Sequence, residues 1–245
     1  MIGEVRTLAV VTARGGSKGL PGKNGRPLLG RPLLAWPVGA ALASRTVDRV
    51  VVSTDDPGLA DLARAAGAEV PFLRPAELAG DLSPSAAAVI HALDVLARAG
   101  VRFGYVILLE PTSPLTEASD VDGAMACLHA SRSVADAIVG VARTGAEHPD
   151  FAVSMDAAGV LAPWAGGGLG CLPRRQDLRP AYRLDGSLYA SDVAAFREAG
   201  GFLHGRTMGW TMPRYKSLEI DDLLDFVCVE AIAARISEFR GETEP

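Results

Sequence analysis

A glycine-rich stretch between residues 13 and 24 carries the densest set of groups able to bind phosphate. Its four glycines and one proline exclude a regular helix. The stretch also carries three cations, Arg14, Lys18 and Lys23, and it follows the apolar run 8–11, which predicts a buried strand. Backbone N–H groups and fixed positive charge at the carboxyl end of a strand suit a polyphosphate. The alternative, a solvated glycine turn with incidental charges, fits this density of glycine and cation less well.

Two familiar phosphate loops do not fit this stretch. The P-loop pattern GxxxxGK[ST] requires glycine where Ser17 stands and a hydroxyl residue where Asn24 stands. The dinucleotide pattern GxGxxG fails because Gly15, Gly16 and Gly19 have a different spacing. A P-loop NTPase and a dinucleotide-dependent dehydrogenase are therefore disfavoured.

Two carboxylates near the end of the chain, Glu219 and Asp221, are separated by one residue. On a strand, which we expect over residues 216–220, this spacing places both side chains on one face. Adjacent carboxylates repel each other unless a cation neutralises them, and oxygen ligands suit Mg²⁺. The pair predicts a magnesium site, with Asp221 as the stronger candidate, because the longer Glu219 side chain allows coordination through water. Alternatively, Asp221 is the N-cap of the last helix.

Strands and helices alternate along the chain as far as residue 142. We expect strands at 8–11, 49–54, 70–73, 105–109 and 137–142, and helices at 33–44, 57–66, 85–99 and from Ser119 or Asp120 to 129. This order predicts an α/β fold with a mostly parallel sheet flanked by helices on both faces. Such sheets bind ligands at the carboxyl ends of their strands. The glycine-rich stretch, Asp55, Arg74 and residues 110–113 should therefore converge on one edge.

The pattern changes between about residues 144 and 192. Short alternating segments at 151–155 and 159–161, with a glycine run at 166–168, predict hairpins in a small inserted lobe. We expect core structure to resume with a strand at 187–190 and a helix at 192–199, and a helix over 222–237 to close the chain. The sequence thus predicts one domain over residues 1–245, with the lobe inserted in it.

Several segments, in order, resemble the acylneuraminate cytidylyltransferases (CMP-sialic acid synthetases). They are ARGGSKGLPGKN from residue 13, LRPAELAGDLSPS from 73, EPTSPL from 110, RRQDL from 174, YRLDGSLY from 182 and SLEID from 217. The resemblance implies a nucleotide-diphospho-sugar transferase-like fold. The implied activity is transfer of CMP from CTP to the anomeric hydroxyl of a 2-keto sugar acid, an N-acylneuraminate or related nonulosonate, with release of pyrophosphate. It also implies Mg²⁺ and a homodimer whose inserted lobe reaches into the neighbouring site.

The resemblance also implies roles for individual residues. Arg14, Lys18 and Lys23 would be catalytic, and Glu219 and Asp221 would bind the metal. The implied nucleotide contacts are Ala13, Arg14, Gly15, Gly16, Ser17, Asn24, Arg74 and Ser85. The implied sugar contacts are Glu110, Thr112, Ser113, Arg175, Arg183, Asp185 and Tyr189, with Arg175 acting across the dimer interface. Without the resemblance, Arg74 is an ordinary surface charge and Ser85 a helix cap.

The departures from the family pattern gather at the sugar end of the implied site. Glu110 stands where glutamine is usual, Thr116 where arginine is usual and Asp185 where asparagine is usual, and no lysine closely follows His148. The acceptor therefore stays open among N-acylneuraminate, legionaminate, pseudaminate, octulosonate and other acidic acceptors. A non-catalytic CTP-binding protein is the alternative from another class, because the change to glutamate at 219 leaves room for weaker metal binding.

Composition excludes several other classes of protein. A net charge of −5 over 245 residues gives no reason to expect nucleic-acid binding. The chain has no apolar run of about 18 residues, and its first residues lack the pattern of a signal peptide, so we expect no contact with a membrane. Cys127, Cys171 and Cys228 are scattered and without CxxC spacing, which is typical of reduced thiols in a cytoplasmic protein.

Overall fold

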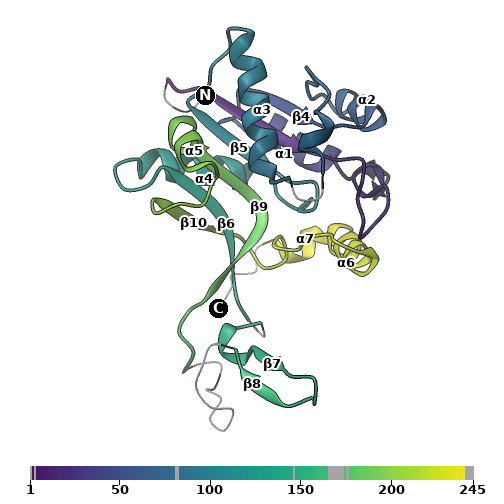
Figure 1. Ribbon diagram of the computed structural model, residues 1–245, viewed down its shortest axis with the longest axis vertical. Coiled ribbons are helices and arrows are strands. Elements are labelled where there is room, and N and C mark those ends of the chain that lie inside the picture. Colours follow the sequence, from purple (N-terminus) through teal and green to yellow (C-terminus); the bar gives the residue numbers. More distant parts are fainter. Residues whose placement is uncertain are drawn as a thin grey trace.

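The computed structural model describes residues 2, 4–80, 83–145, 147–164, 174 and 177–240 (Figure 1). Its central sheet contains β1 Thr7–Thr12, β4 Arg49–Ser53, β5 Tyr105–Leu109, β6 Ala137–Arg143, β9 Tyr182–Asp192 and β10 Thr207–Thr211. The six strands lie in the order β10-β6-β9-β5-β1-β4. Strand β9 is antiparallel to both of its neighbours, and the other three pairs are parallel. The prediction of a mostly parallel sheet is confirmed.

Helices cover both faces of this sheet. They are α1 Ala35–Ala43, α2 Pro57–Ala65, α3 Ser85–Arg98, α4 Ala118–Ala130 and α5 Val193–Ala199. Successive strand residues point to opposite faces, so β1 directs Ala9 and Val11 one way and Leu8 and Val10 the other. The first face packs against α1, α2 and α4, and the second against α3 and α5. The two-sided arrangement and the approximate positions of these five helices are confirmed.

Acidic residues fix where the later helices begin. A capping box of Glu117 and Asp120 starts α4, so the cap lies earlier than the predicted Ser119 or Asp120. The C-terminal helix predicted as continuous is divided into α6 Leu223–Ala233 and α7 Ile236–Phe239, with non-helical backbone at Arg235 between them. Asp222 caps α6 through a box with Asp225. The alternative that made Asp221 the cap is therefore wrong.

Two predicted strands are absent from the described residues. Residues 70–73 form no strand, because only Glu69 bridges to the sheet, at Val51. Residues 216–220 also form no strand, and turns link Lys216 and Ser217 back to the residues before them. The sheet edge beside β6 is formed instead by β10, which the sequence reasoning missed.

The predicted hairpin of the inserted lobe is present. Strands β7 Val153–Met155 and β8 Leu161–Pro163 pair with each other away from the central sheet (Figure 1). The predicted lobe limit near residue 192 extends too far, because β9 joins the central sheet. Short elements complete the chain: the β2 Pro27–Leu28 and β3 Arg31–Pro32 hairpin, and 3-10 helices at Lys23–Gly25, Ala76–Leu78 and Pro149–Phe151. No helix of the described residues is both long and apolar enough to cross a membrane.

A third apolar cluster lies beside the sheet and joins distant parts of the chain. Leu20, from the glycine-rich stretch, packs there with Leu28, Leu115, Ile220 and Phe226 of α6. Ile220 is fully buried in this cluster and stands between the two carboxylates at 219 and 221. Burial of its side chain therefore brings the acidic pair to the glycine-rich stretch.

Candidate functional site

The candidate site lies at one edge of the central sheet. The carboxyl ends of β1, β4 and β5 meet there, and β9 enters from the same edge because it runs the opposite way (Figure 1). The register pairs Tyr189 of β9 with Leu108 of β5, so the residues that follow Leu109 lie beside the first half of β9. Loops at this edge are the usual ligand site of open α/β sheets.

The glycine-rich stretch is tied to the end of β4. The Ala13 N–H donates to the Ser53 carbonyl at 3.0 Å, and the Gly15 N–H donates to Asp55 Oδ1 at 3.1 Å. The Gly15 amide therefore already has an acceptor in the protein and is not available to a phosphate in this conformation. Beside it, a Cβ on Gly16 would meet nothing within 4 Å, so this part of the loop faces open space.

Asn24 and Arg14 stabilise the loop from within. Asn24 is buried, and its Nδ2 donates to the Arg14 carbonyl at 2.9 Å. A direct contact of Asn24 with the nucleotide stays a prediction. Arg14 is half-buried and lies close enough to Arg74 to lower the pKa of that guanidinium, while Lys18 is exposed and Ser17 half-buried. Arg14, Ser17 and Lys18 thus flank the open part of the loop in the sequence, and none of them is fully buried.

Lys23 connects the loop to the acidic pair. Its side chain is buried, and Nζ donates to the Ile220 carbonyl at 2.5 Å and lies 3.4 Å from Asp221 Oδ1. The approach of the two segments is close, because a Cβ on Gly19 would stand 2.4 Å from the Asp221 carbonyl oxygen. Glycine at 19 is therefore required by packing.

Arg74 is held at the end of β4. Its backbone N–H donates to the Thr54 carbonyl at 2.7 Å, Nε donates to Ser53 Oγ at 3.1 Å, and Nη2 donates to the Ser53 carbonyl. Burial lowers the pKa of Arg74, and the nearby Asp55 carboxylate opposes this. The sequence alternative that made Arg74 an ordinary surface charge is wrong, since the residue is 8% exposed.

Glu110, at the end of β5, accepts a hydrogen bond from Ser85 at the start of α3. Ser85 Oγ lies 2.9 Å from Glu110 Oε1, so Ser85 contacts the site and does not cap its own helix. Burial raises the pKa of Glu110, and the Asp221 carboxylate raises it further, while the Ser85 hydrogen bond and the Lys23 ammonium oppose the shift. Glu110 is thus a half-buried carboxyl group with charges of both signs nearby.

Tyr189 completes a cavity beside Glu110. Burial, followed by the Glu110, Glu219 and Asp185 carboxylates, raises the pKa of Tyr189 to about 12, so its phenol stays protonated and can donate. The cavity has a volume of about 390 Å³. Its lining consists of Ser85, Ala86, Leu108, Glu110, Tyr189 and residues 199–203. A few polar groups among mostly apolar ones are typical of a small-molecule pocket.

Thr112 and Ser113 follow Glu110 in the loop after β5. Their hydroxyl oxygens are buried and have no hydrogen-bond partner among the described residues. The Thr112 carbonyl accepts from the Ile220 N–H at 2.8 Å, which fixes this loop against the acidic segment. Buried hydroxyls without partners are costly, so these two are candidates to bind a ligand.

The carboxylates of Glu219 and Asp221 reach the same edge without the predicted strand. The Asp221 side chain is 80% exposed, whereas Glu219 packs over Gly186, where a Cβ would stand 2.6 Å from Glu219 Cδ. Burial raises the pKa of Glu219, and the Glu110 and Asp221 carboxylates raise it further. Lys23 offsets only part of the charge of this acidic pair, which suits a hard cation, although the described residues contain no group of three or more His, Cys, Asp or Glu able to enclose a metal.

Arg183 and Asp185, two further predicted sugar contacts, differ in their exposure to solvent. Arg183 is exposed, and its Nη2 donates to the Ser217 carbonyl at 2.5 Å. Asp185 is fully buried and accepts from Ser187 N–H at 3.0 Å, Ser187 Oγ at 2.6 Å and Ser217 Oγ at 2.9 Å. Both carboxylate oxygens are therefore occupied within the protein, so a direct contact with the sugar is not supported. Arg175 lies outside the described residues.

Sequence reasoning missed the cavity wall after α5. Helix α5 ends at Gly200, whose φ of +69° turns the chain toward Phe202 and Leu203. Only the glycine pair after an apolar helix could have indicated a turn here, and nothing in the sequence indicated that the turn faces Glu110.

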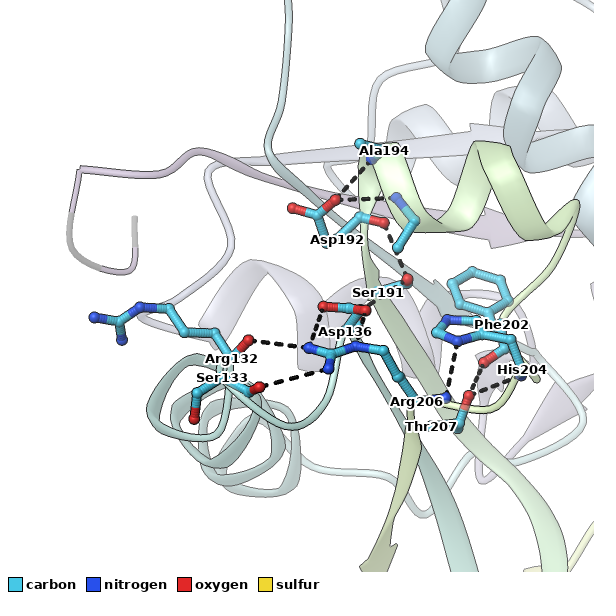
Figure 2. Close-up of polar contacts among 11 residues, drawn as sticks. Arg132, Ser133, Asp136, Ser191, Asp192, Ala194, Phe202, His204, Arg206 and Thr207 are labelled. Carbon is cyan, nitrogen blue, oxygen red and sulfur yellow. Dashed lines mark hydrogen bonds and ion pairs between the residues drawn. The ribbon is translucent and has the colours of Figure 1, made fainter.

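Polar contacts brace this wall (Figure 2). Thr207 Oγ1 donates to the Phe202 carbonyl at 2.9 Å and accepts from the His204 N–H at 2.9 Å. Arg206 lies beside Asp136, with 2.5 Å between Nε and Oδ2, which ties the loop to the start of β6. The cavity wall is thus attached to the sheet and not a loose surface loop.

Together, the open α/β sheet, the cationic glycine loop and the acidic pair define a phosphate-handling enzyme of the nucleotide-sugar type. The sequence matches the cytidylyltransferase family over residues 8–162. The chain belongs to this family, and it is a nucleotidyltransferase.

Individual relatives agree with this assignment. The chain is 34% identical to the CMP-N,N'-diacetyllegionaminic acid synthase of Legionella pneumophila, over 93% of this chain and 96% of that protein. It is 28% identical to the N-acylneuraminate cytidylyltransferase of Escherichia coli O18:K1:H7, over 90% of this chain but 50% of that longer protein. The fold resembles a CMP:2-keto-3-deoxy-manno-octonic acid synthetase solved with CTP, with a TM-score of 0.68 and 17% identity over 94% and 99% of the two chains. The predicted family and fold are confirmed.

Proposed function

We propose that this protein transfers CMP from CTP to the anomeric hydroxyl of a nine-carbon 2-keto sugar acid, releasing pyrophosphate. One arrangement carries the proposal: the buried Lys23 joins the phosphate loop to Asp221, on the edge that also holds Glu110 and the cavity. The names of the relatives support the same reaction, since they activate legionaminic and neuraminic acids.

The chain contributes mainly positioning and charge. Arg14, Lys18 and Lys23 would hold the triphosphate and stabilise the negative charge on the departing pyrophosphate. Arg74 and Ser85 would face the nucleoside, and the N–H groups near Gly16 would approach the phosphates. A covalent enzyme intermediate is not required, because the sugar hydroxyl can attack the α-phosphorus directly.

Glu219 and Asp221 would hold Mg²⁺. The donor set fits this ion, because Mg²⁺ in nucleotide enzymes takes one or two carboxylates and completes its shell with phosphate oxygens and water. Mg²⁺ would supply neutralisation of the phosphate charge and a lower pKa for a bound hydroxyl. Lys23 contacts Asp221 from the protein side, so the exposed face of that carboxylate is the one available to the ion.

The cavity beside Glu110 is the proposed site of the sugar acid. Its volume of about 390 Å³ lies within the range of small-molecule pockets. Glu110 and Tyr189 would hydrogen-bond the hydroxyl groups, and Phe202 and Leu203 offer an apolar wall for less polar substituents. The buried hydroxyls of Thr112 and Ser113, in the loop after β5, would make further hydrogen bonds to the sugar acid.

A homodimer is part of this proposal. The β7–β8 hairpin exposes apolar side chains that a monomer would leave in water, namely Val153, Met155, Val160, Leu161 and Trp164. A second copy covering this lobe would bury them, and Arg175 would then reach the anionic sugar of the neighbouring site. The cytoplasmic location inferred from the scattered cysteines also stays part of the proposal.

Pyrophosphate release tests the function directly. We would incubate the protein with CTP and Mg²⁺ and with each of N-acetylneuraminate, N,N'-diacetyllegionaminate, pseudaminate and 3-deoxy-manno-octulosonate. Turnover with a nine-carbon acid, lost in Asp221→Asn, is the expected result. Turnover with the eight-carbon acid alone would show that the acceptor is an eight-carbon acid and not a nine-carbon one. CTP binding without turnover on any acid would support a non-catalytic nucleotide-binding protein.

A further inference from the structure

The segment 213–222 carries both proposed metal ligands but has no strand partner among the described residues. Its position is set by individual contacts. The Ile220 N–H donates to the Thr112 carbonyl at 2.8 Å, and Ser217 Oγ donates to Asp185 Oδ2 at 2.9 Å. A segment without ladder hydrogen bonds depends on such contacts for the placement of its side chains.

Lys216 makes the most buried charged contacts of this segment. It is 4% exposed, and its Nζ lies 2.7 Å from Glu117 Oε2 and 2.7 Å from Asp120 Oδ2. Burial lowers the pKa of Lys216, but the hydrogen bonds to Asp120 and Glu117 outweigh burial and raise it, so the ammonium group stays charged. The two carboxylates are the capping box of α4.

The carboxylates are themselves fixed in place. Helix α4 buries Val121, Ala124 and Met125 in the core beneath the sheet. On the other side, Arg240 donates to Glu117, and the Tyr215 ring stacks on Phe239 of α7 with 5.6 Å between centroids. Lys216 is therefore attached to a rigid helix and is enclosed by the C-terminal helix.

A buried ion cluster is weak evidence for stability, because apolar residues of similar size often stabilise as well or better. What the cluster provides is a defined position: Lys216 precedes Glu219 by three residues and Asp221 by five. We propose that Lys216 is a positioning residue, which clamps the segment to α4 so that Glu219 and Asp221 present their carboxylates together to the metal and the triphosphate. This inference rests on the proposed function.

Mn²⁺ is a suitable probe, since it replaces Mg²⁺ at oxygen sites and is detected by electron paramagnetic resonance without turnover. In the CTP complex, Lys216→Met should weaken Mn²⁺ binding about tenfold. This loss is at the lower end of the range typical when residues that orient metal ligands are replaced. CTP affinity without metal should change much less, because the hydrogen bonds of Lys216 go to Glu117 and Asp120 and not to the phosphate loop. Lys216→Arg, which keeps the cation, should recover part of the Mn²⁺ affinity.

A second variant guards against unfolding. Lys216→Met leaves Asp120 buried beside Glu117 with less compensation, so the double variant Lys216→Met with Asp120→Asn removes the excess charge while keeping an acceptor for the Glu117 N–H. It should fold and still show the weaker Mn²⁺ binding. The control is Arg197→Met, which breaks the 2.6 Å pair with Asp94 between α5 and α3 and should leave Mn²⁺ binding unchanged.

The outcomes separate the two proposals. If the unmodified protein binds Mn²⁺ with CTP, and Lys216→Met and the double variant bind it equally well, the positioning role is wrong while the proposed function stands. If the unmodified protein with CTP binds no Mn²⁺, the metal site itself is wrong, and the inference about Lys216 falls with it.

Discussion

Replacing Lys23 with methionine removes the cation that joins the phosphate loop to the acidic segment and keeps most of the side-chain volume. The loss of folding stability follows from the two contacts of the Lys23 ammonium group. At 3.4 Å from Asp221 Oδ1, the gross Coulomb energy is about 5 kcal/mol at an effective dielectric constant of ~20. The Asp221 side chain is 80% exposed, however, and solvent screening reduces such a pair to roughly 1 kcal/mol or less.

The hydrogen bond from Nζ to the Ile220 carbonyl, at 2.5 Å, is buried and less screened. Hydrogen bonds from charged donors contribute about 1.5–3 kcal/mol. We therefore expect Lys23→Met to lower the free energy of unfolding by about 2–3 kcal/mol, while the protein stays folded. Loss of the positive charge from the transition state should cost more, roughly 10²–10³ in kcat, as for other preorganised donors to developing negative charge.

The assay measures kcat and KM for CTP by pyrophosphate release, with thermal unfolding followed in parallel. Arg197→Met is the control, because its ion pair lies between α3 and α5, outside the proposed site. The reasoning would be refuted if Lys23→Met, folded at the assay temperature, kept kcat within about threefold of the unmodified protein, less than 1 kcal/mol of transition-state energy.

Three further substitutions probe the same edge of the sheet. Burial raises the pKa of Glu110, so the protonated carboxyl group is favoured in the folded protein. The stability that this group contributes is present at low pH and is lost as pH rises through the raised pKa. Glu110→Gln should therefore raise Tm at pH 7 but not at pH 4. Gly186 has φ +68°, and a Cβ would stand 2.6 Å from Glu219 Cδ; Gly186→Ala should cost about 1–2 kcal/mol of stability and reduce turnover. The two carboxylate oxygens of Asp185 accept from three buried donors, and Asp185→Asn replaces one of these oxygens with an NH2 group that cannot accept. The substitution should cost about 1–3 kcal/mol in urea unfolding, with little change in KM for the sugar acid.

Each of these has a result that would contradict it. A Tm gain for Glu110→Gln of equal size at pH 4 and pH 7 would mean that ionisation of this group is not the cause. Normal turnover in Gly186→Ala would show that the position of Glu219 tolerates displacement. A large rise in KM for the sugar acid in Asp185→Asn, with unchanged stability, would restore the direct sugar contact that the buried position argues against.

The sequence by itself determined the fold class and predicted the nucleotide end of the proposed site. Alternating apolar strands and helices require a parallel sheet covered on both faces, and the position of polar loops after the strands follows from that topology. The glycine and cation density of residues 13–24 marked the phosphate loop, and the spacing of Glu219 and Asp221 marked an acidic pair. These patterns involve residues close together in the chain, so they can be recognised from the sequence alone.

Only the tertiary structure decided how the acidic pair is held. The sequence predicted a strand, but the pair reaches the edge because Ile220 is buried in a cluster with Leu20 and because Lys23 and Thr112 hydrogen-bond the backbone of Ile220. It also decided that Asp185 is an internal acceptor, and that the turn at Phe202 forms the cavity wall. These outcomes depend on contacts between residues far apart in the chain, which neither spacing nor periodicity records.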